Sequence, residues 1–218
     1  MYHVSMDSNW FSISQEKRTA IKYISENFYP AKYMNRWRDF KEISYKLSEI
    51  VKLYSSTQIT EEIEHFEFFK QYFNEDTLDL PLPESYIKWF DSMLLAFRHG
   101  NIDEIASRFH MITEGILATV GLKILNETSM ELPEFNFNIK KIIEDEARHI
   151  NFGFQIIMNP NYAVNRIEEL YPYAEDIIKD GMKYLEPIGY SWYDLRKLML
   201  ELKEARINKL KKKIMSAN

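Results

Sequence analysis

The sequence predicts an all-α protein: a four-helix bundle with a connecting helix and two further helices at its C-terminal end. Apolar residues recur at helical spacing along most of the 218 residues, and no segment shows a convincing strand pattern. A Glu-x-x-His motif occurs twice, at 62–65 and 146–149. We expect a single domain over 1–218, with the bundle at about 12–158 and the C-terminal helical pair at about 162–215.

Seven helices are expected along the chain. Their ranges, from apolar spacing and helix breakers, are 12–27, 39–73, 84–98, 101–126, 137–158, 162–184 and 191–215. Ser12 and Gln15 fit a capping box at the start of the first helix, and Asn101 or Asp103 can cap the fourth. The second helix contains the polar run 55–57, but neither glycine nor proline breaks it there.

Composition and charge limit the classes of function. The net charge of −5 argues against broad binding to nucleic-acid phosphates. Cysteine is absent, which excludes disulfides, thiolate zinc sites, iron–sulfur clusters and a cysteine nucleophile. No apolar run is long enough to span a bilayer, and the first residues do not resemble a signal peptide. We expect a cytoplasmic protein that binds neither nucleic acid nor membrane.

The two Glu-x-x-His motifs carry the strongest chemical signal. Residues three apart on a helix share a face. The pair Glu62 and His65 can therefore bind one metal ion, and so can the pair Glu146 and His149. The chain has only five histidines, and two of them close these motifs. Glu114 lies between the motifs, as an acid in an otherwise apolar helical stretch. A Glu from each of two helices plus Glu-x-x-His from each of the other two is the ligand set of a di-metal carboxylate bundle.

A symmetric site needs a sixth ligand, a carboxylate on the first helix. Glu114 and Glu146 are 32 residues apart, and the same separation before Glu62 falls near position 30. The nearest acid is Glu26, with Asp39 farther away. Glu26 is therefore the predicted ligand; the alternative is that it is a surface acid near the end of its helix.

The run Asp-Glu-Ala-Arg-His at 145–149, followed by Phe-Gly at 152–153, resembles the fourth-helix signature of ferritin-like di-iron carboxylate proteins. It is most similar to the group with the ribonucleotide reductase small subunit and its ligand-binding oxidase relatives, bacterial multicomponent monooxygenases and acyl-carrier-protein desaturases. The ligand spacing also resembles the cyanobacterial aldehyde-deformylating oxygenases. The resemblance covers roughly residues 15–158. It implies a cofactor of two iron ions, with manganese and iron as a possible alternative.

The resemblance also implies roles for particular residues. The Glu and His of each motif would bind metal, and Glu114 would be the catalytic carboxylate that bridges or shifts as oxygen binds. Asp145 would accept a hydrogen bond from the free ring nitrogen of His65, and Glu61 would accept one from His149, since metal-bound imidazoles usually have such a partner.

Several further residues are candidates for supporting roles. Arg148 stands where related proteins form a buried ion pair. His110 lies four residues before Glu114 on the same face, as an extra ligand, a hydrogen-bond donor or a core histidine, of which we favour the last two. Tyr72 and Tyr54 are the tyrosines best placed for redox chemistry, although most of the 14 tyrosines must be packing residues.

Small residues after Glu114 predict a cavity beside the metals. Ala118 and Gly121 follow it on the same helical face and leave space there. In the family topology the second and third helices run parallel and the fourth antiparallel. On that basis the apolar walls of the cavity would be completed by Phe69, Tyr72, Ile139 and Ile142. The alternative is an ordinary bundle core, in which small residues serve close packing.

Four functions remain open at this stage. The leading one is an oxygen-activating oxidase or oxygenase that uses O2, a small, largely apolar substrate and an external electron donor; a homodimer is compatible with it. The others are a ferritin- or rubrerythrin-like ferroxidase, a tRNA hydroxylase or radical-generating subunit with a macromolecular partner, and a helical binding module without metal. The missing cysteines weaken the rubrerythrin alternative, because no rubredoxin site can form.

Overall fold

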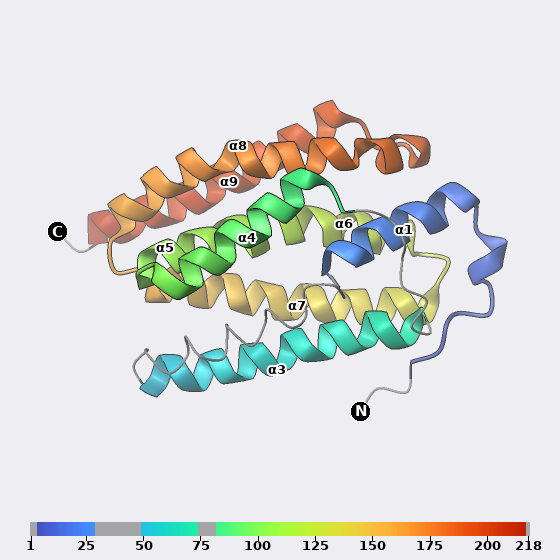
Figure 1. Ribbon diagram of the computed structural model, residues 1–218, viewed down its shortest axis with the longest axis horizontal. Helices are drawn as coiled ribbons and strands as arrows, with labels where there is room; N and C mark the ends of the chain where they lie inside the picture. The colour runs from blue at the N-terminus through green and yellow to red at the C-terminus, as the bar shows by residue number, and fades with distance from the viewer. Residues whose placement is uncertain (1–3, 29–48, 74–81, 217–218) are drawn as a thin grey trace.

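The computed structural model is all-α, as the sequence predicts. It describes residues 4–28, 49–73 and 82–216. No strand occurs within these ranges, and none of the helices there is long and apolar enough to cross a membrane. In Figure 1, α3 (Glu49–Tyr72) lies beside α7 (Pro133–Ile156), while α8 (Pro160–Leu185) and α9 (Trp192–Ser216) pair on the far side of the molecule.

The first helix, α1, spans Gln15–Phe28 and begins later than predicted. The Ser14 hydroxyl accepts a hydrogen bond from the backbone N–H of Lys17 at 3.2 Å, as an N-cap side chain does. Ser12 instead ends a short 3-10 turn, Trp10–Ser12. The capping box predicted at Ser12 is therefore wrong, because that residue already belongs to another turn.

The first Glu-x-x-His motif lies on α3, which continues through 55–57 without interruption. The predicted connecting helix is α4 (Glu84–His99), and Gly100 follows it. The helix expected over 39–48 and most of the loop expected over 74–83 lie outside the described residues.

The third bundle helix has three consecutive parts: α5 (Ile102–Ala106), the π-helical segment η3 (Ser107–Ala118) and α6 (Thr119–Thr128). Of the two predicted caps, Asn101 is the one used, since its side chain accepts from the backbone N–H of Glu104 at 2.9 Å. This helix runs in the same direction as α3, and α7 runs back, as Figure 1 shows. The parallel and antiparallel arrangement expected from the family topology is present.

The π-helical segment was not predicted. A π-helix bonds residue i to i+5, and two threonine hydroxyls here reach the carbonyl five residues back. Thr113 Oγ1 donates to the Arg108 carbonyl, and Thr119 Oγ1 donates to the Glu114 carbonyl, both at 2.9 Å. The wider turn surrounds Glu114. Such segments are frequent at functional sites in helices.

Helix α7 begins at Pro133, although residues 128–136 were predicted to form a loop. Proline suits the first turn of a helix, where its missing N–H has no intrahelical partner anyway. The carboxylate of Asp7 caps this end, with Oδ1 accepting from the N–H of Glu134 and Oδ2 from that of Phe135, both at 3.0 Å. The capping residue lies 127 and 128 residues upstream of the two it caps, so no local pattern could predict it.

Helices α8 and α9 pack on each other and on η3. Helix α8 also contacts α1 at Gly181, where an added Cβ would lie only 2.8 Å from the ring of Tyr23. Buried apolar side chains from Trp10 to Leu210 form one continuous core through these helices. The C-terminal pair therefore belongs to the same packed core as the bundle.

A largely buried ion-pair network at Glu104 joins α5 to η3 and α8. Its carboxylate accepts hydrogen bonds from Arg108 on η3 and from Arg166 and Tyr162 on α8, the last two at 2.7 and 2.8 Å. Burial alone would raise the pKa of Glu104, but Arg166, Arg108 and Tyr162 outweigh it and lower the pKa to about 2. The ionised carboxylate thus stabilises the folded state.

We expect Glu104→Gln to lower the free energy of unfolding at neutral pH by roughly 1–3 kcal/mol. Because the folded pKa lies below the ordinary value, this stabilisation is present above about pH 4.5 and is lost as the pH falls toward 2. Urea denaturation of both proteins at pH 7 and pH 3 measures the difference, which should shrink at the lower pH. Glu84→Gln, at an exposed ion pair with Lys88, is the control and should cost little. A loss that is equal at both pH values would contradict the expectation.

Candidate metal centre

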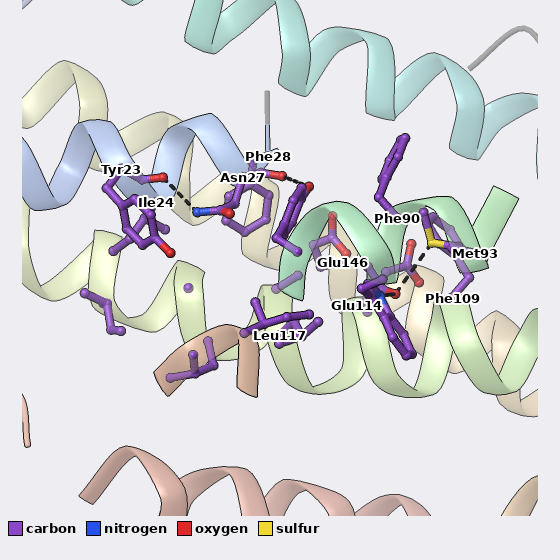
Figure 2. Close-up of a pocket in the computed structure, with 18 of the residues that line it drawn as sticks. Tyr23, Ile24, Asn27, Phe28, Phe90, Met93, Phe109, Glu114, Leu117 and Glu146 are labelled. Atoms are coloured by element: carbon purple, nitrogen blue, oxygen red, sulfur yellow. Dashed lines mark hydrogen bonds between the residues drawn. The ribbon is translucent and has the colours of Figure 1, made fainter. Parts of the chain in front are cut away.

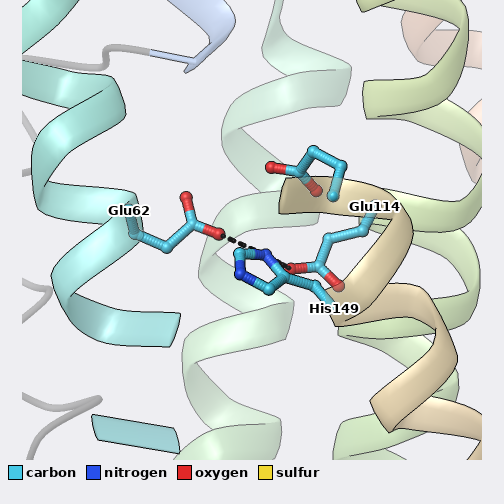
Figure 3. A group of neighbouring side chains, drawn as sticks. Glu62, Glu114 and His149 are labelled. Carbon is cyan, nitrogen blue, oxygen red and sulfur yellow. Dashed lines mark ion pairs between the residues drawn. The ribbon is translucent and has the colours of Figure 1, made fainter. Parts of the chain in front are cut away.

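Five ionisable side chains converge inside the bundle: Glu62 and His65 from α3, Glu114 from η3, and Glu146 and His149 from α7. One ligand atom from each of Glu62, Glu114, Glu146 and His149 lies within 4.8 Å of the others. Figure 3 shows Glu62, Glu114 and His149 pointing toward one another. His65 joins them, with Nδ1 at 3.7 Å from Glu62 Oε2 and 3.8 Å from Glu146 Oε1. The structure therefore brings both predicted motifs and Glu114 together.

Both histidines are buried, and each donates a hydrogen bond from Nε2, the ring nitrogen that faces away from the cluster. His65 Nε2 donates to Asp145 Oδ2 at 2.9 Å, and His149 Nε2 donates to Glu61 Oε2 at 2.7 Å. These are the two contacts that the family resemblance implied. They fix each ring with its Nδ1 facing the cluster, in the manner of a metal-binding imidazole.

Arg148 connects the two acids that hold the histidines. Its Nη2 contacts Glu61 Oε1 at 2.8 Å and also pairs with Asp145 Oδ1. The guanidinium is half exposed, so it lies at the outer edge of the site rather than in a buried ion pair. One surface cation thus links the partners of both imidazoles.

Both oxygens of Glu114 are occupied by neighbouring side chains. Gln58 Nε2 donates to Oε1, and His110 Nδ1 donates to Oε2, each at 2.7 Å. His110 is therefore a buried hydrogen-bond donor, one of the two favoured roles. Gly153 on α7 permits this packing, since an added Cβ would lie 2.2 Å from His110 Cβ. Gln58 was missed in the sequence, although it lies one helical turn before Glu62 on the same face.

The surrounding carboxylates favour the protonated form of both histidines. Burial alone would lower the pKa of His65, but Asp145 and Glu62 outweigh it and raise the pKa to about 10. Burial would likewise lower the pKa of His149, and Glu114 and Glu62 instead raise it to about 12. A cation that binds at Nδ1 must displace these protons.

The carboxylates differ from one another in pKa. Burial alone would raise the pKa of Glu62, but the nearby imidazoles of His149 and His65 outweigh it and lower the pKa to about 2. Burial, followed by the negative charges of Glu62 and Glu114, raises the pKa of Glu146. The other carboxylates thus disfavour a further negative charge at Glu146, and a bound cation would relieve this repulsion.

Glu26, the predicted sixth ligand, is buried on α1 but is not among the ligand atoms that converge. The face of α1 that lines the neighbouring pocket carries Tyr23, Ile24, Asn27 and Phe28. At about 100° per residue, Glu26 lies about 130° from the centre of that face. The argument from sequence separation chose the helix, but it could not choose the face of that helix, because sequence separation does not specify how a helix is rotated in the bundle. Asp39 lies outside the described residues.

A pocket of about 120 Å³ opens directly beside the cluster, lined at one end by Glu62, Glu114 and Glu146. Figure 2 shows Glu114 and Glu146 facing the same space as Leu117, Phe90 and Phe28. Most of its walls are apolar or aromatic, and they come from α1, α4, η3, α6 and α8. Representative lining residues are Ile24, Phe28, Trp89, Phe90, Met93 and Leu117. Sequence reasoning did not assign α1, α4 and α8 to this pocket.

Ala118 and Gly121 line the pocket. Gly121 also serves packing, since an added Cβ would lie 3.1 Å from the ring of Phe28 on α1. The other four predicted lining residues are not among those that line this pocket: Phe69, Tyr72, Ile139 and Ile142. Helices α3 and α7 pack directly there, and the rings of Phe69 and Tyr72 lie 6.2 and 4.8 Å from that of Phe135.

Tyr72 has a contact that explains its burial without redox chemistry. Its hydroxyl donates to Asp7 Oδ2 at 2.9 Å, and Asp7 in turn caps α7. Burial, and then this partner, raises the pKa of Tyr72. The tyrosine anchors the N-terminal segment to the bundle. The side chain of Tyr54 lies outside the described residues.

The residues present fit a metal pair. Nδ1 of His65, Nδ1 of His149 and Oε2 of Glu146 are buried without a hydrogen-bond partner among the described residues. Buried polar atoms are rarely left in this state, and these three belong to one cluster. Carboxylate and imidazole donors together suit iron and manganese, and the donor set holds no thiolate.

Solved structures of R2-like ligand-binding oxidases share this fold. One variant with an anaerobically reconstituted Mn/Fe cofactor has a TM-score of 0.75 at 16% identity, covering 96% of this chain and 86% of its own. Another with an aerobically reconstituted Fe/Fe cofactor has a TM-score of 0.70 at 16% identity, covering 92% and 83%. No protein-family model and no curated protein sequence matches the chain. The predicted ferritin-like fold is confirmed by these structures.

Proposed function

We propose that this chain is a dinuclear metal oxidase or oxygenase that uses O2 and acts on a small, largely apolar substrate. The observation that carries the proposal is the buried carboxylate–histidine cluster that opens directly onto an apolar pocket. The metals are proposed to be two irons, or manganese with iron, the cofactors of the R2-like ligand-binding oxidases that share the fold. When bound, such a pair supplies the reduction of oxygen and the oxidising power.

The contacts of Glu62 suggest two metal positions. Its Oε1 lies 3.5 Å from His149 Nδ1, and its Oε2 lies 3.7 Å from His65 Nδ1, so its two oxygens face different histidines. Glu114 Oε1 lies 3.4 Å from His149 Nδ1, and Glu146 Oε1 lies 3.8 Å from His65 Nδ1. We therefore propose that His149 and Glu114 would hold one metal and His65 the other, with Glu62 and Glu146 close to both histidines.

Glu114 is the proposed mobile carboxylate. Gln58 and His110 each donate to one of its oxygens, and each oxygen keeps a lone pair with which it could bind a cation. The hydrogen bonds to Asp145 and Glu61, which Arg148 links, keep the two imidazoles oriented toward the cluster.

The walls of the pocket favour binding of an apolar substrate over passage of iron ions. A ferroxidase that stores iron needs a polar route for hydrated cations, whereas these walls are mostly apolar and aromatic. Beside the three carboxylates, the neutral polar side chains of the lining are Asn27 and Thr113, together with the hydroxyls of Tyr23 and Tyr86 and the indole N–H of Trp89. Trp89 Nε1 donates to Thr113 Oγ1 at 3.0 Å, and the Tyr86 hydroxyl donates to the Asn27 carbonyl. Such walls exclude water and select an apolar molecule. An external electron donor remains part of the proposal.

Metal content and oxygen uptake test this function. Protein loaded anaerobically with Fe(II) should retain about two metal ions per chain by elemental analysis. It should then consume O2 in amounts comparable to its bound iron, measured with an oxygen electrode. Protein loaded with Zn(II), which has no redox chemistry, is the control and should consume none. Retention of many irons per chain would favour the ferroxidase alternative, and absence of bound metal would favour a helical binding module.

A further inference from the structure

A second cavity, of about 530 Å³, lies between α6, α7 and α9. Among the described residues, Glu146 alone lines both this cavity and the pocket beside the cluster, and its carboxylate is engaged in the cluster. Most of the other lining residues are apolar or cationic, and Thr119 and Asn151 are neutral and polar. The apolar part includes Leu122, Ile143, Ile150 and Phe154, and the cations are Lys123, Arg206 and Lys209. The cavity is thus amphipathic, with positive charge along one side.

Arg206 on α9 is a partly buried cation that has no acidic partner in the described part of the chain. Its Nη2 donates to the Gly115 carbonyl at 2.9 Å, and its Nε is buried without a hydrogen-bond partner there. Burial alone lowers the pKa of Arg206, and no carboxylate opposes that effect. A guanidinium has five N–H donors, of which the described structure uses one. A buried charge without a counter-charge is destabilising unless something neutralises it.

The π-helical segment makes room for this guanidinium. An added Cβ at Gly115 would lie 3.1 Å from Arg206 Nε, so a side chain there would displace the cation. By contrast, Arg196 on the same helix is exposed and pairs with Glu175 at 2.8 Å. Arg206 therefore points inward without an acidic partner among the described residues, unlike Arg196.

Lys209 lies one helical turn from Arg206 at the same cavity. Its Nζ donates to the side-chain oxygen of Asn151 at 3.0 Å and lies 4.2 Å from the centre of the Phe154 ring. Both partners are neutral, and no acid pairs with Lys209 in the described part of the chain. Lys123, in contrast, pairs with Glu127. Two positive charges, Arg206 and Lys209, thus remain available at one side of the cavity.

We propose that this cavity binds a small molecule with a carboxylate head and an apolar body. The head lies at Arg206 and Lys209, where guanidinium and ammonium donors supply charge-assisted hydrogen bonds. The body lies along Leu122, Ile143 and Ile150. The site is distinct from the metal centre, and it does not depend on the proposed function.

Titration with octanoate tests the proposal, with 1-octanol as the neutral probe of similar length. Binding is measured by calorimetry on metal-free protein, so that no carboxylate can bind to a metal. We expect one octanoate site in the native protein, and about tenfold weaker binding, or more, in Arg206→Met. The affinity for 1-octanol should change little. Arg196→Met, the same change at an exposed position of α9, should leave octanoate binding as it is.

A second variant blocks the cavity and keeps the guanidinium. Ala205 is exposed and lines the cavity, so Ala205→Trp can fill it at little cost to folding. Octanoate binding should be lost in this variant while the circular dichroism spectrum stays native. The proposal is overturned if the native protein binds no octanoate, or if Arg206→Met and Ala205→Trp both bind it as the native protein does.

Discussion

The double variant His65→Ala/His149→Ala should retain less than about a tenth of the metal that the native protein binds. The Nδ1 atoms of both histidines lie in the cluster without a hydrogen-bond partner among the described residues, and each proposed metal position has one of them. Removing a ligand of this kind typically costs well over an order of magnitude in affinity. Elemental analysis after anaerobic loading and desalting measures the loss.

His99→Ala is the matched control, because His99 is an exposed histidine at the end of α4. It should bind metal like the native protein. The histidine variants leave Asp145 and Glu61 without their ring partners, so helicity must be compared by circular dichroism. Full metal occupancy in a folded double variant would show that the cluster is not the metal site.

The helices were predictable because their apolar faces repeat along the sequence and pack against one another. The errors occurred where distant residues decide the local structure. Pro133 begins α7 only because Asp7, far upstream, caps that end. The π-helical segment is an exception, since its contacts, such as that of Thr119 with the Glu114 carbonyl, are local. It escaped prediction because its apolar residues still fit the spacing of an α-helix.

The centre of the site was predictable for a different reason. Glu-x-x-His is a local motif, and a helix places its two side chains on one face whatever the rest of the fold does. Asp145 and Glu61, the hydrogen-bond partners of the imidazoles, adjoin the motifs, so they could be predicted together with them. Glu26 and the pocket walls depend on how helices rotate and cross, which spacing along one chain does not specify. Gln58 had a signal, its position one turn before Glu62, but an uncharged amide is not distinctive.

Ala118→Phe should abolish most binding of small apolar molecules while the metal centre remains. Ala118 lines the pocket one turn beyond Glu114 but contributes no ligand atom, so a ring there occupies the space that a substrate needs. The pocket holds only about 120 Å³, and a phenyl ring fills most of it. We expect affinity for toluene to fall by about tenfold or more, measured by calorimetry, with metal content unchanged. Overpacking costs roughly 1–3 kcal/mol of stability, which thermal unfolding checks.

Ile142→Val distinguishes between two candidate binding sites: the pocket in the structure and the one predicted from the sequence. Ile142 is buried on α7 and was expected to line the cavity, but the structure places it outside the pocket. Its substitution should cost about 0.5–1.5 kcal/mol of stability and leave toluene binding unchanged. If Ala118→Phe binds toluene like the native protein while Ile142→Val does not, the pocket beside Glu114 is not the binding site. In that case the α3–α7 side of the cluster is where the substrate enters.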